Sequence, residues 1–163
     1  MDIDNRIRDF EKQAHKNWHR TIFILRKHLD IWTHKSIKPY WGQMKISYMP
    51  VICNISIDGS TAAEIAQKSM IMKQAMSRSL KDLREKGMIS SKTNNKDKRS
   101  EYLEPTAEGK KLILEANEES QKLSDIYKEI VGEKNFEIAL DVLNKIISYH
   151  ENLHDKKEDY MED

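Results

Sequence analysis

Residues 60–106 read STAAEIAQKSMIMKQAMSRSLKDLREKGMISSKTNNKDKRSEYLEPT. Two short helical patterns are followed by a glycine at position 87, a strand-like run over 88–93, a polar loop over 94–99 and a second strand-like run over 100–103. Two helices followed by a β-hairpin are the element order of a winged helix-turn-helix. We therefore expect a mainly α fold with a small β-hairpin wing.

The two helices are marked by caps and by apolar spacing. Thr61, followed three residues later by Glu64, predicts a capping box at the start of the first helix, which we expect to end near Lys68. Ser69 is the predicted cap of the second helix and Gly87 its stop. Apolar residues at steps of four, four and three form the inner face of the second helix: Met72, Met76, Leu80 and Leu83. The opposite face carries Lys73, Gln74, Ser77, Arg78 and Lys81.

Basic residues are concentrated in the second helix and in the loop of the predicted hairpin. Residues 73–99 carry nine Lys and Arg against three Asp and Glu, although the whole chain has a net charge of only +1. Such a local excess of positive charge suits a phosphate backbone, because neutralising phosphates releases counterions. The same charges also fit a solvated helix face and a lysine-rich turn, so charge alone leaves both interpretations open.

Long amphipathic helices are predicted on both sides of this stretch. Apolar residues recur at steps of three and four from Ile3 to Trp32 and predict one helix over 3–36, ended by Pro39 and Gly42. Similar patterns predict helices over 107–131 and 134–153, with Gly132 between them. A helix cannot bury a long apolar stripe alone, so we expect these helices to pack with one another and with those of a second subunit.

The segment 44–57 predicts a shorter helix that begins near Ser47, since Pro50 is tolerated only in a first turn. The predicted core face of this helix consists of Met49, Ile52, Cys53 and Ile55. The chain then divides into a helical dimerisation region, 1–42 and 107–163, and a winged helix-turn-helix region, 43–106. Together they are expected to form one intertwined domain.

Length and composition narrow the class of protein. A chain of 163 residues fits one domain with a dimerisation element, and it has neither a run of 18 apolar residues nor a signal-peptide pattern at its start. A single cysteine cannot form an internal disulfide and is typical of a reducing compartment. We therefore expect a cytoplasmic protein that neither spans a membrane nor is secreted.

The motifs also resemble those of a known family. Leu80, Leu83 and Lys86-Gly87-Met88-Ile89 are followed by Asp97-Lys98-Arg99, Leu103 and Thr106-Ala107-Glu108-Gly109. This order resembles the MarR family of bacterial transcriptional regulators, whose pattern is Leu, Lys-Gly-Leu-Val, Asp-x-Arg and Leu-Thr-x-x-Gly at similar spacings. Glu64-Ile65-Ala66 is similar to the family's Glu-Leu-Ala in the helix before the recognition helix.

Two positions depart from the family pattern. The family's Leu-Thr pair is split here into Leu103-Glu104-Pro105-Thr106, which predicts a reshaped junction between the wing and the following helix. The Thr that usually starts the helix before Ile52 is replaced by Lys45, with Ser47 nearby. Neither departure removes an element that reads DNA.

The resemblance implies a homodimeric regulator that binds double-stranded DNA, acts as a repressor and is released by a small molecule or another signal. Two winged heads would contact successive major grooves of a pseudo-palindromic operator, with half-sites about one helical turn apart. This function requires no enzyme activity, cofactor or metal.

The expected DNA contacts are Thr61, Lys73, Gln74, Ser77, Arg78, Lys81, Lys96, Asp97, Lys98 and Arg99. In the major groove a Gln side chain pairs with adenine and an Arg side chain with guanine. We assign the planar cation of Arg99 to the narrow minor groove, and Lys96 and Lys98 to phosphates. By resemblance, Asp97 orients Arg99; a solvated ion pair of little energetic value is the alternative.

Aromatic residues occur in and beside the helices that join the dimerisation region to the head: Trp18, Trp32, Tyr40, Trp41 and Tyr48. Family members often bind small aromatic ligands there, which makes these residues a candidate ligand pocket, although aromatic residues at helical spacing usually belong to a core. Cys53 is a candidate redox sensor by resemblance, but its apolar helix predicts a buried and unreactive cysteine.

Two other functions stay open on the sequence. His150-Glu151-Asn152-Leu153-His154 matches H-E-x-x-H, the zinc-binding motif of metalloproteases, and a plain amphipathic helix explains the same residues. His15 and His19 form a second pair spaced by four. The two pairs could hold a structural or regulatory metal between them, and the alternative interpretation is two pairs of partly solvated histidines. The other alternative is a winged helix that binds proteins instead of DNA.

Overall fold

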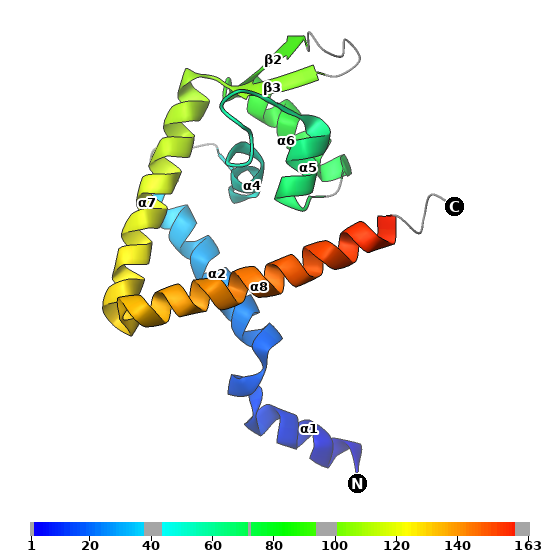
Figure 1. The fold of residues 1–163 in the computed structure, drawn as a ribbon, viewed down its shortest axis with the longest axis vertical. Coiled ribbons are helices and arrows are strands. Elements are labelled where there is room, and N and C mark those ends of the chain that lie inside the picture. The colour runs from blue at the N-terminus through cyan, green and yellow to red at the C-terminus, as the bar shows by residue number, and fades with distance from the viewer. Residues whose placement is uncertain (1, 38–43, 72, 94–100, 159–163) are drawn as a thin grey trace. The chain divides into compact units, whose positions relative to one another are not determined.

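The structure, a computed structural model, describes residues 2–37, 44–71, 73–93 and 101–158, of which 73, 93 and 154–158 are described by backbone alone. The chain is mainly helical with one small antiparallel sheet, which confirms the expected fold class. It divides into two compact units, Met1–Ala116 and Asn117–Asp163. Figure 1 shows the elements from α1 to α8. None of the described helices is both long and apolar enough to span a lipid bilayer.

The N-terminal helices are shorter than the sequence pattern predicts. α1 (Ile3–Lys12) is followed by a 3-10 turn, η1 (Ala14–Lys16), and then by α2 (Trp18–Ser36). The prediction of one helix over 3–36 is wrong because Asn17 caps a new helix: its side-chain oxygen accepts a hydrogen bond from the Arg20 amide at 2.9 Å. The apolar spacing continues through this break and conceals it. Pro39 and Gly42, the predicted helix stops, lie outside the described residues.

After α2 the chain forms a 3-10 turn, η2 (Ile46–Tyr48), which leads into a four-residue helix, α4 (Met49–Ile52). Pro50 lies in the first turn of α4, which confirms its predicted role. The helix ends at Ile52, well before Ile57, so Cys53 falls in the turn beyond it and is exposed; its assignment to the core is wrong. The protein around it still raises the pKa of the Cys53 thiol by desolvation, which keeps the thiol protonated and weakly nucleophilic.

The caps of the two central helices follow the sequence in part. α5 (Ala62–Ser69) begins with the predicted capping box, in which the Thr61 hydroxyl accepts from the Glu64 amide at 3.2 Å and the Glu64 carboxylate accepts from the Thr61 amide at 2.7 Å. α6 (Lys73–Glu85) stops before Gly87, as expected, and Gly87 has a φ of +68°. The expected cap of α6, Ser69, lies instead in the last turn of α5, where its hydroxyl donates to the Pro50 carbonyl at 2.8 Å.

The wing belongs to a three-stranded antiparallel sheet with the strand order β1-β3-β2. β2 (Ile89–Thr93) and β3 (Glu101–Pro105) form the predicted hairpin, with Ser91 opposite Leu103. β1 (Ser60–Thr61) pairs with the other edge of β3. The sequence did not predict β1, because two residues are too few to show an alternating pattern.

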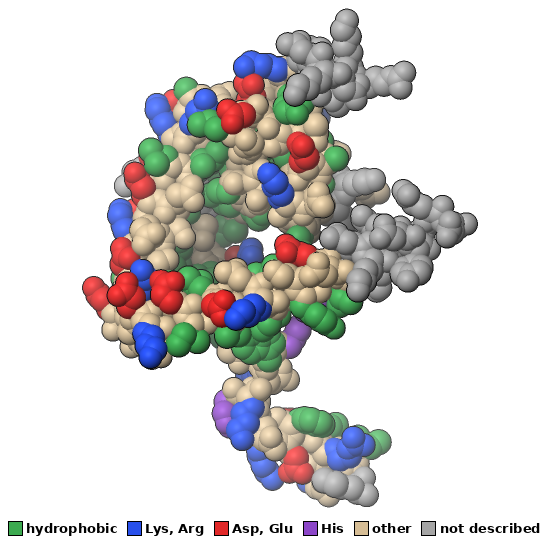
Figure 2. Space-filling model, viewed as in Figure 1, with side chains coloured by type: hydrophobic (Ala, Val, Ile, Leu, Met, Phe, Trp, Pro, Cys, Tyr) green, Lys and Arg blue, Asp and Glu red, His purple; other side chains and the backbone are tan. Residues whose placement is uncertain are grey.

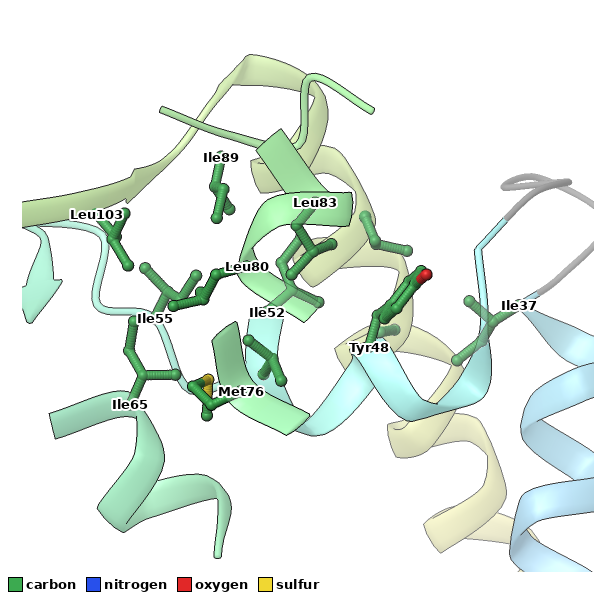
Figure 3. Packing of buried hydrophobic residues seen from close by; sticks show 13 residues of the cluster. Ile37, Tyr48, Ile52, Ile55, Ile65, Met76, Leu80, Leu83, Ile89 and Leu103 are labelled. Carbon is green, nitrogen blue, oxygen red and sulfur yellow. The ribbon is translucent and has the colours of Figure 1, made fainter. Parts of the chain in front are cut away.

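One hydrophobic core holds these elements together (Figure 3). Its fully buried side chains come from α4, α5, α6, β3 and α7, and they include Ile52, Ile65, Leu83, Leu103 and Leu112. Met76, Leu80 and Leu83 of α6 are buried in this core, as their spacing predicts; Met72 lies outside the described residues. α6 is therefore held by one face, and its opposite face is left to solvent.

Thr106 fastens the wing to α7 (Ala107–Val131). Its hydroxyl donates to the Gly87 carbonyl at 2.6 Å and accepts from the Gly109 amide at 3.1 Å, so it caps α7 and contacts the turn after α6. The Thr106 amide also donates to the Met88 carbonyl at 3.0 Å. Pro105 is accommodated as the last residue of β3, directly before this cap.

In the second unit, α7 continues to Val131 and α8 runs from Glu133 to Glu158. Gly132, with a φ of +82°, ends α7 at the predicted position. Beside this turn the rings of Tyr127 and Phe136 lie 6.5 Å apart, and Lys128 Nζ lies 3.6 Å from Glu137 Oε1. These contacts join the end of α7 to the start of α8.

Candidate nucleic-acid interface

The outer face of α6 is polar and lies opposite the face that the core buries. Met76 and Leu83 are only 2% and 0% exposed. On the other side, four predicted contact residues of this helix are exposed: Gln74, Ser77, Arg78 and Lys81. Because they are spaced by three and four residues along the helix, they form one continuous stripe. Lys73 was assigned to the same face, and its side chain is outside the described part of the chain.

Several cations near this stripe are already paired with carboxylates. Lys81 Nζ lies 3.8 Å from Glu85 Oε1, and Arg84 pairs with Glu101 at the start of β3. Among the cations of α6 whose side chains are described, Arg78 is the one without a carboxylate partner. The Lys81 pair is well exposed and therefore weak, so water or a phosphate replaces Glu85 at little cost. Among the described cations of α6, the available charge is therefore centred on Arg78.

Thr61 is half-buried at the start of α5, where it has a structural role. Its hydroxyl oxygen is the acceptor of the capping box, and the hydroxyl also hydrogen-bonds the Glu64 carboxylate. The hydrogen bond from the Thr61 amide, and after it the one from the Thr61 side chain, lowers the pKa of Glu64. The carboxylate therefore stays ionised and the cap intact at neutral pH.

The wing is described at its base. Lys92 Nζ of β2 lies 2.6 Å from Glu104 Oε2 of β3, which joins the two strands on their exposed side. Hydrogen bonding from Ser91, and then the pairing with Arg84, lowers the pKa of Glu101. The four predicted wing contacts, Lys96, Asp97, Lys98 and Arg99, lie outside the described residues. They stay predictions from the sequence.

Tyr48 is a packing residue that contacts α6. Its side chain is 3% exposed, and its hydroxyl donates a hydrogen bond to the Asp82 carboxylate of α6 (Figure 3 shows the Tyr48 ring at the edge of the core). Lys45 Nζ lies 3.9 Å from the same carboxylate and 5.5 Å from the centre of the Tyr48 ring. The Tyr48 oxygen and then the Asp82 charge raise the pKa of Lys45. Sequence reasoning missed this contact because Tyr48 and Asp82 are 34 residues apart.

We expect Tyr48→Phe to lower the free energy of unfolding by about 1–2 kcal/mol, because it removes a buried hydrogen bond to a charged acceptor. Urea denaturation followed by circular dichroism measures this loss. Tyr102→Phe is the matched control, since the described residues give the Tyr102 hydroxyl no hydrogen-bond partner. Equal stability of the two variants would contradict the role assigned to the Tyr48 hydroxyl.

Two of the predicted aromatic ligand residues lie far apart on one helix. Trp18 and Trp32 both lie on α2 and are 14 residues apart, which is about 21 Å along a helix. Tyr40 and Trp41 are outside the described residues. A small hollow does lie between the end of α2 and η2, lined by Thr33, His34, Ile37, Met44, Lys45, Ile46 and Met49. Trp18, Trp32 and Tyr48 do not line it, so a ligand bound by the five aromatic residues stays a prediction.

The histidine pairs do not assemble into a larger cluster in the described part of the chain. His15 and His19 are exposed near the break between α1 and α2, and His150 is exposed on α8. The side chain of His154 is outside the described residues. Among the residues whose side chains are described, no group of three His, Cys, Asp or Glu is placed to hold a metal ion.

The comparison with known families identifies the segment that carries α6. Residues 44–100 match the sequence pattern of the MarR family. Over its winged-helix segment the chain is therefore similar to the MarR family. Its match covers η2, α4, β1, α5, α6 and β2, and it confirms the resemblance stated from the motifs. No curated protein sequence matches the chain.

Solved structures share the MarR fold over most of the chain. The transcriptional repressor CouR, solved bound to a 23-mer DNA duplex, is 19% identical with a TM-score of 0.70, over 83% of this chain and 95% of that chain. The regulator BldR from Sulfolobus solfataricus is 23% identical with a TM-score of 0.65, over 86% of this chain and 96% of that chain. The regulator SlyA is 18% identical with a TM-score of 0.71, over 82% of this chain and 93% of that chain. At these identities the likeness establishes the fold.

Proposed function

We propose that this chain is a sequence-specific transcriptional regulator that binds double-stranded DNA. The observation that carries the proposal is the outer face of α6, a polar stripe centred on Arg78, which has no carboxylate partner among the described residues. A helix held by its opposite face presents such a stripe as a unit, and the major groove of B-DNA is wide enough to admit it. The fold shared with CouR, which was solved on DNA, supports the same interpretation.

The contacts divide into base reading and backbone positioning. Arg78 pairs with guanine and Gln74 with adenine in the major groove, while Lys73, Ser77 and Lys81 contact phosphates beside them. At the start of α5, Thr61 lies beside a phosphate. In the wing, Arg99 enters the minor groove with Asp97 orienting it, and Lys96 and Lys98 contact phosphates.

The regulator acts as a homodimer built by residues 1–42 and 107–163. Long runs of apolar side chains are exposed on both parts (Figure 2), including Ile3, Phe10, Phe23 and Ile31 in the first and Ile126, Ile130, Ile138, Ile147 and Leu153 in the second. Ile3, Phe10 and Ile130 are 71%, 73% and 71% exposed. A monomer rarely leaves such continuous apolar stripes in water, and a second copy of the same helices covers them.

A dimer of this kind reads a pseudo-palindrome, because its two-fold axis repeats the α6 contacts one helical turn further along the duplex. Bound at a promoter, it excludes other proteins from the same DNA and acts as a repressor, and a small aromatic ligand or another signal releases it. The protein works in the cytoplasm, where its DNA lies.

Titration of the protein with a duplex that it selects from a random pool tests this proposal. We expect two protomers per duplex and an affinity that falls by about a thousand-fold or more between 50 and 200 mM salt if about six phosphates are contacted. Fluorescence anisotropy measures both quantities. Absence of any salt-dependent duplex binding would defeat the proposal and favour a winged helix that binds proteins.

A further inference from the structure

The last turn of α6 is joined to the first residue of β3 by the ion pair between Arg84 and Glu101. The same carboxylate also receives a hydrogen bond from Ser91 of β2. One side chain therefore connects three elements: the helix assigned to the major groove and both strands of the wing. The two charged residues are 17 positions apart in the sequence.

The position of Glu101 gives this contact its importance. Leu103, two residues further along β3, is 1% exposed and belongs to the core, so the core fixes the inner end of the hairpin. Glu101 is the first residue of β3 and directly follows the segment 94–100, which carries the cations assigned to the DNA backbone and the minor groove. The pair with Arg84 thus attaches the wing to α6 at the first residue of β3, directly after the segment 94–100.

The pair contributes little to folding. The side chains of Arg84 and Glu101 are 40% and 53% exposed, and exposed ion pairs are worth about 1 kcal/mol or less. The pair instead acts on geometry, because it favours one orientation of the wing relative to α6. If α6 and the wing contact adjacent grooves together, as proposed above, DNA binding depends on that orientation.

We propose that Glu101 is a positioning residue for DNA recognition, which through Arg84 holds the wing in register with α6. This inference rests on the proposed function. It also predicts that removing the Glu101 charge changes DNA affinity in the direction opposite to the usual one. Removal of a carboxylate close to DNA ordinarily strengthens binding, because it removes repulsion from phosphates. If Glu101 orients the wing, its neutralisation weakens binding instead.

Glu101→Gln and Glu104→Gln form a matched pair for the test. Both remove one negative charge from β3 and keep the shape of the side chain. Glu104 contacts Lys92 within the wing, whereas Glu101 contacts Arg84 on the helix. On the duplex selected by the parent protein, at one salt concentration, we expect Glu101→Gln to bind about two- to five-fold more weakly. Glu104→Gln should bind as tightly as the parent or more tightly.

A charge exchange separates positioning from a direct phosphate contact by Arg84. Arg84→Glu alone should weaken binding, and the double variant Arg84→Glu with Glu101→Arg should recover most of the loss, since the pair is restored in reverse. Urea denaturation should give all variants nearly the parent stability. If Glu101→Gln binds at least as tightly as Glu104→Gln, or if the exchange recovers nothing, the inference is wrong. Failure of the parent itself to bind any duplex would overturn the proposed function as well.

Discussion

Arg78→Ala is expected to weaken binding of the selected duplex by about ten- to a hundred-fold, the largest loss for any single contact on α6. A bidentate pairing between Arg and guanine is worth about 1–3 kcal/mol, and Arg78 is available for it because the described residues give it no competing carboxylate. Its exposure on the side opposite Met76 and Leu83 means that the substitution should leave the core intact. Fluorescence anisotropy at fixed salt measures the loss.

The duplex used decides what kind of contact is lost. If Arg78 reads a base, the loss is confined to the selected duplex, and affinity for random duplex changes little. Lys134→Ala is the control for charge, because it removes one cation from the exposed start of α8, far along the chain from the stripe. Parent-like affinity of Arg78→Ala for the selected duplex would show that α6 does not read DNA through this residue.

Sequence reasoning located α6 and its exposed face because the signals involved are local. The spacing of Met76, Leu80 and Leu83 fixes which side of α6 is buried, and it therefore fixes the exposed side as well. The capping box at Thr61 and the glycine stops at Gly87 and Gly132 are likewise contained in a few neighbouring residues. Each of these predictions needs no knowledge of what lies elsewhere in the chain.

The features that sequence reasoning missed depend on contacts between distant residues or on short competing signals. Asn17 divides the N-terminal helix although the apolar spacing continues through it. The hydrogen bond accepted by its side chain starts a new helix there, and apolar spacing alone does not show such a break. Cys53 is exposed because α4 stops after one turn. The pairs Tyr48–Asp82 and Arg84–Glu101 exist only once the fold has brought their elements together. The charge count over 73–99 had no means of recognising such partners.

Gly109→Ala is expected to destabilise the protein by about 3 kcal/mol or more, the largest stability loss we predict. A Cβ atom at this position would lie 2.0 Å from the Met88 carbonyl oxygen, far inside any allowed contact. That carbonyl cannot easily retreat, because it accepts a hydrogen bond from the Thr106 amide at 3.0 Å. Urea denaturation measures the loss.

Gly87→Ala separates the effect of space from that of backbone conformation. Gly87 has a φ of +68°, and a Cβ atom added to it would have no neighbour within 4 Å, so alanine there meets only the strain of a left-handed backbone, about 1–2 kcal/mol. Gly109 lies in the first turn of α7 and shows no such backbone strain, so its cost comes from the collision with Met88 alone. A loss at Gly109 no larger than that at Gly87 would contradict the close approach of α7 to the turn after α6. That approach explains the final Gly of the Thr106-Ala107-Glu108-Gly109 motif. Only a residue without Cβ lets α7 start directly against Met88, the residue before β2.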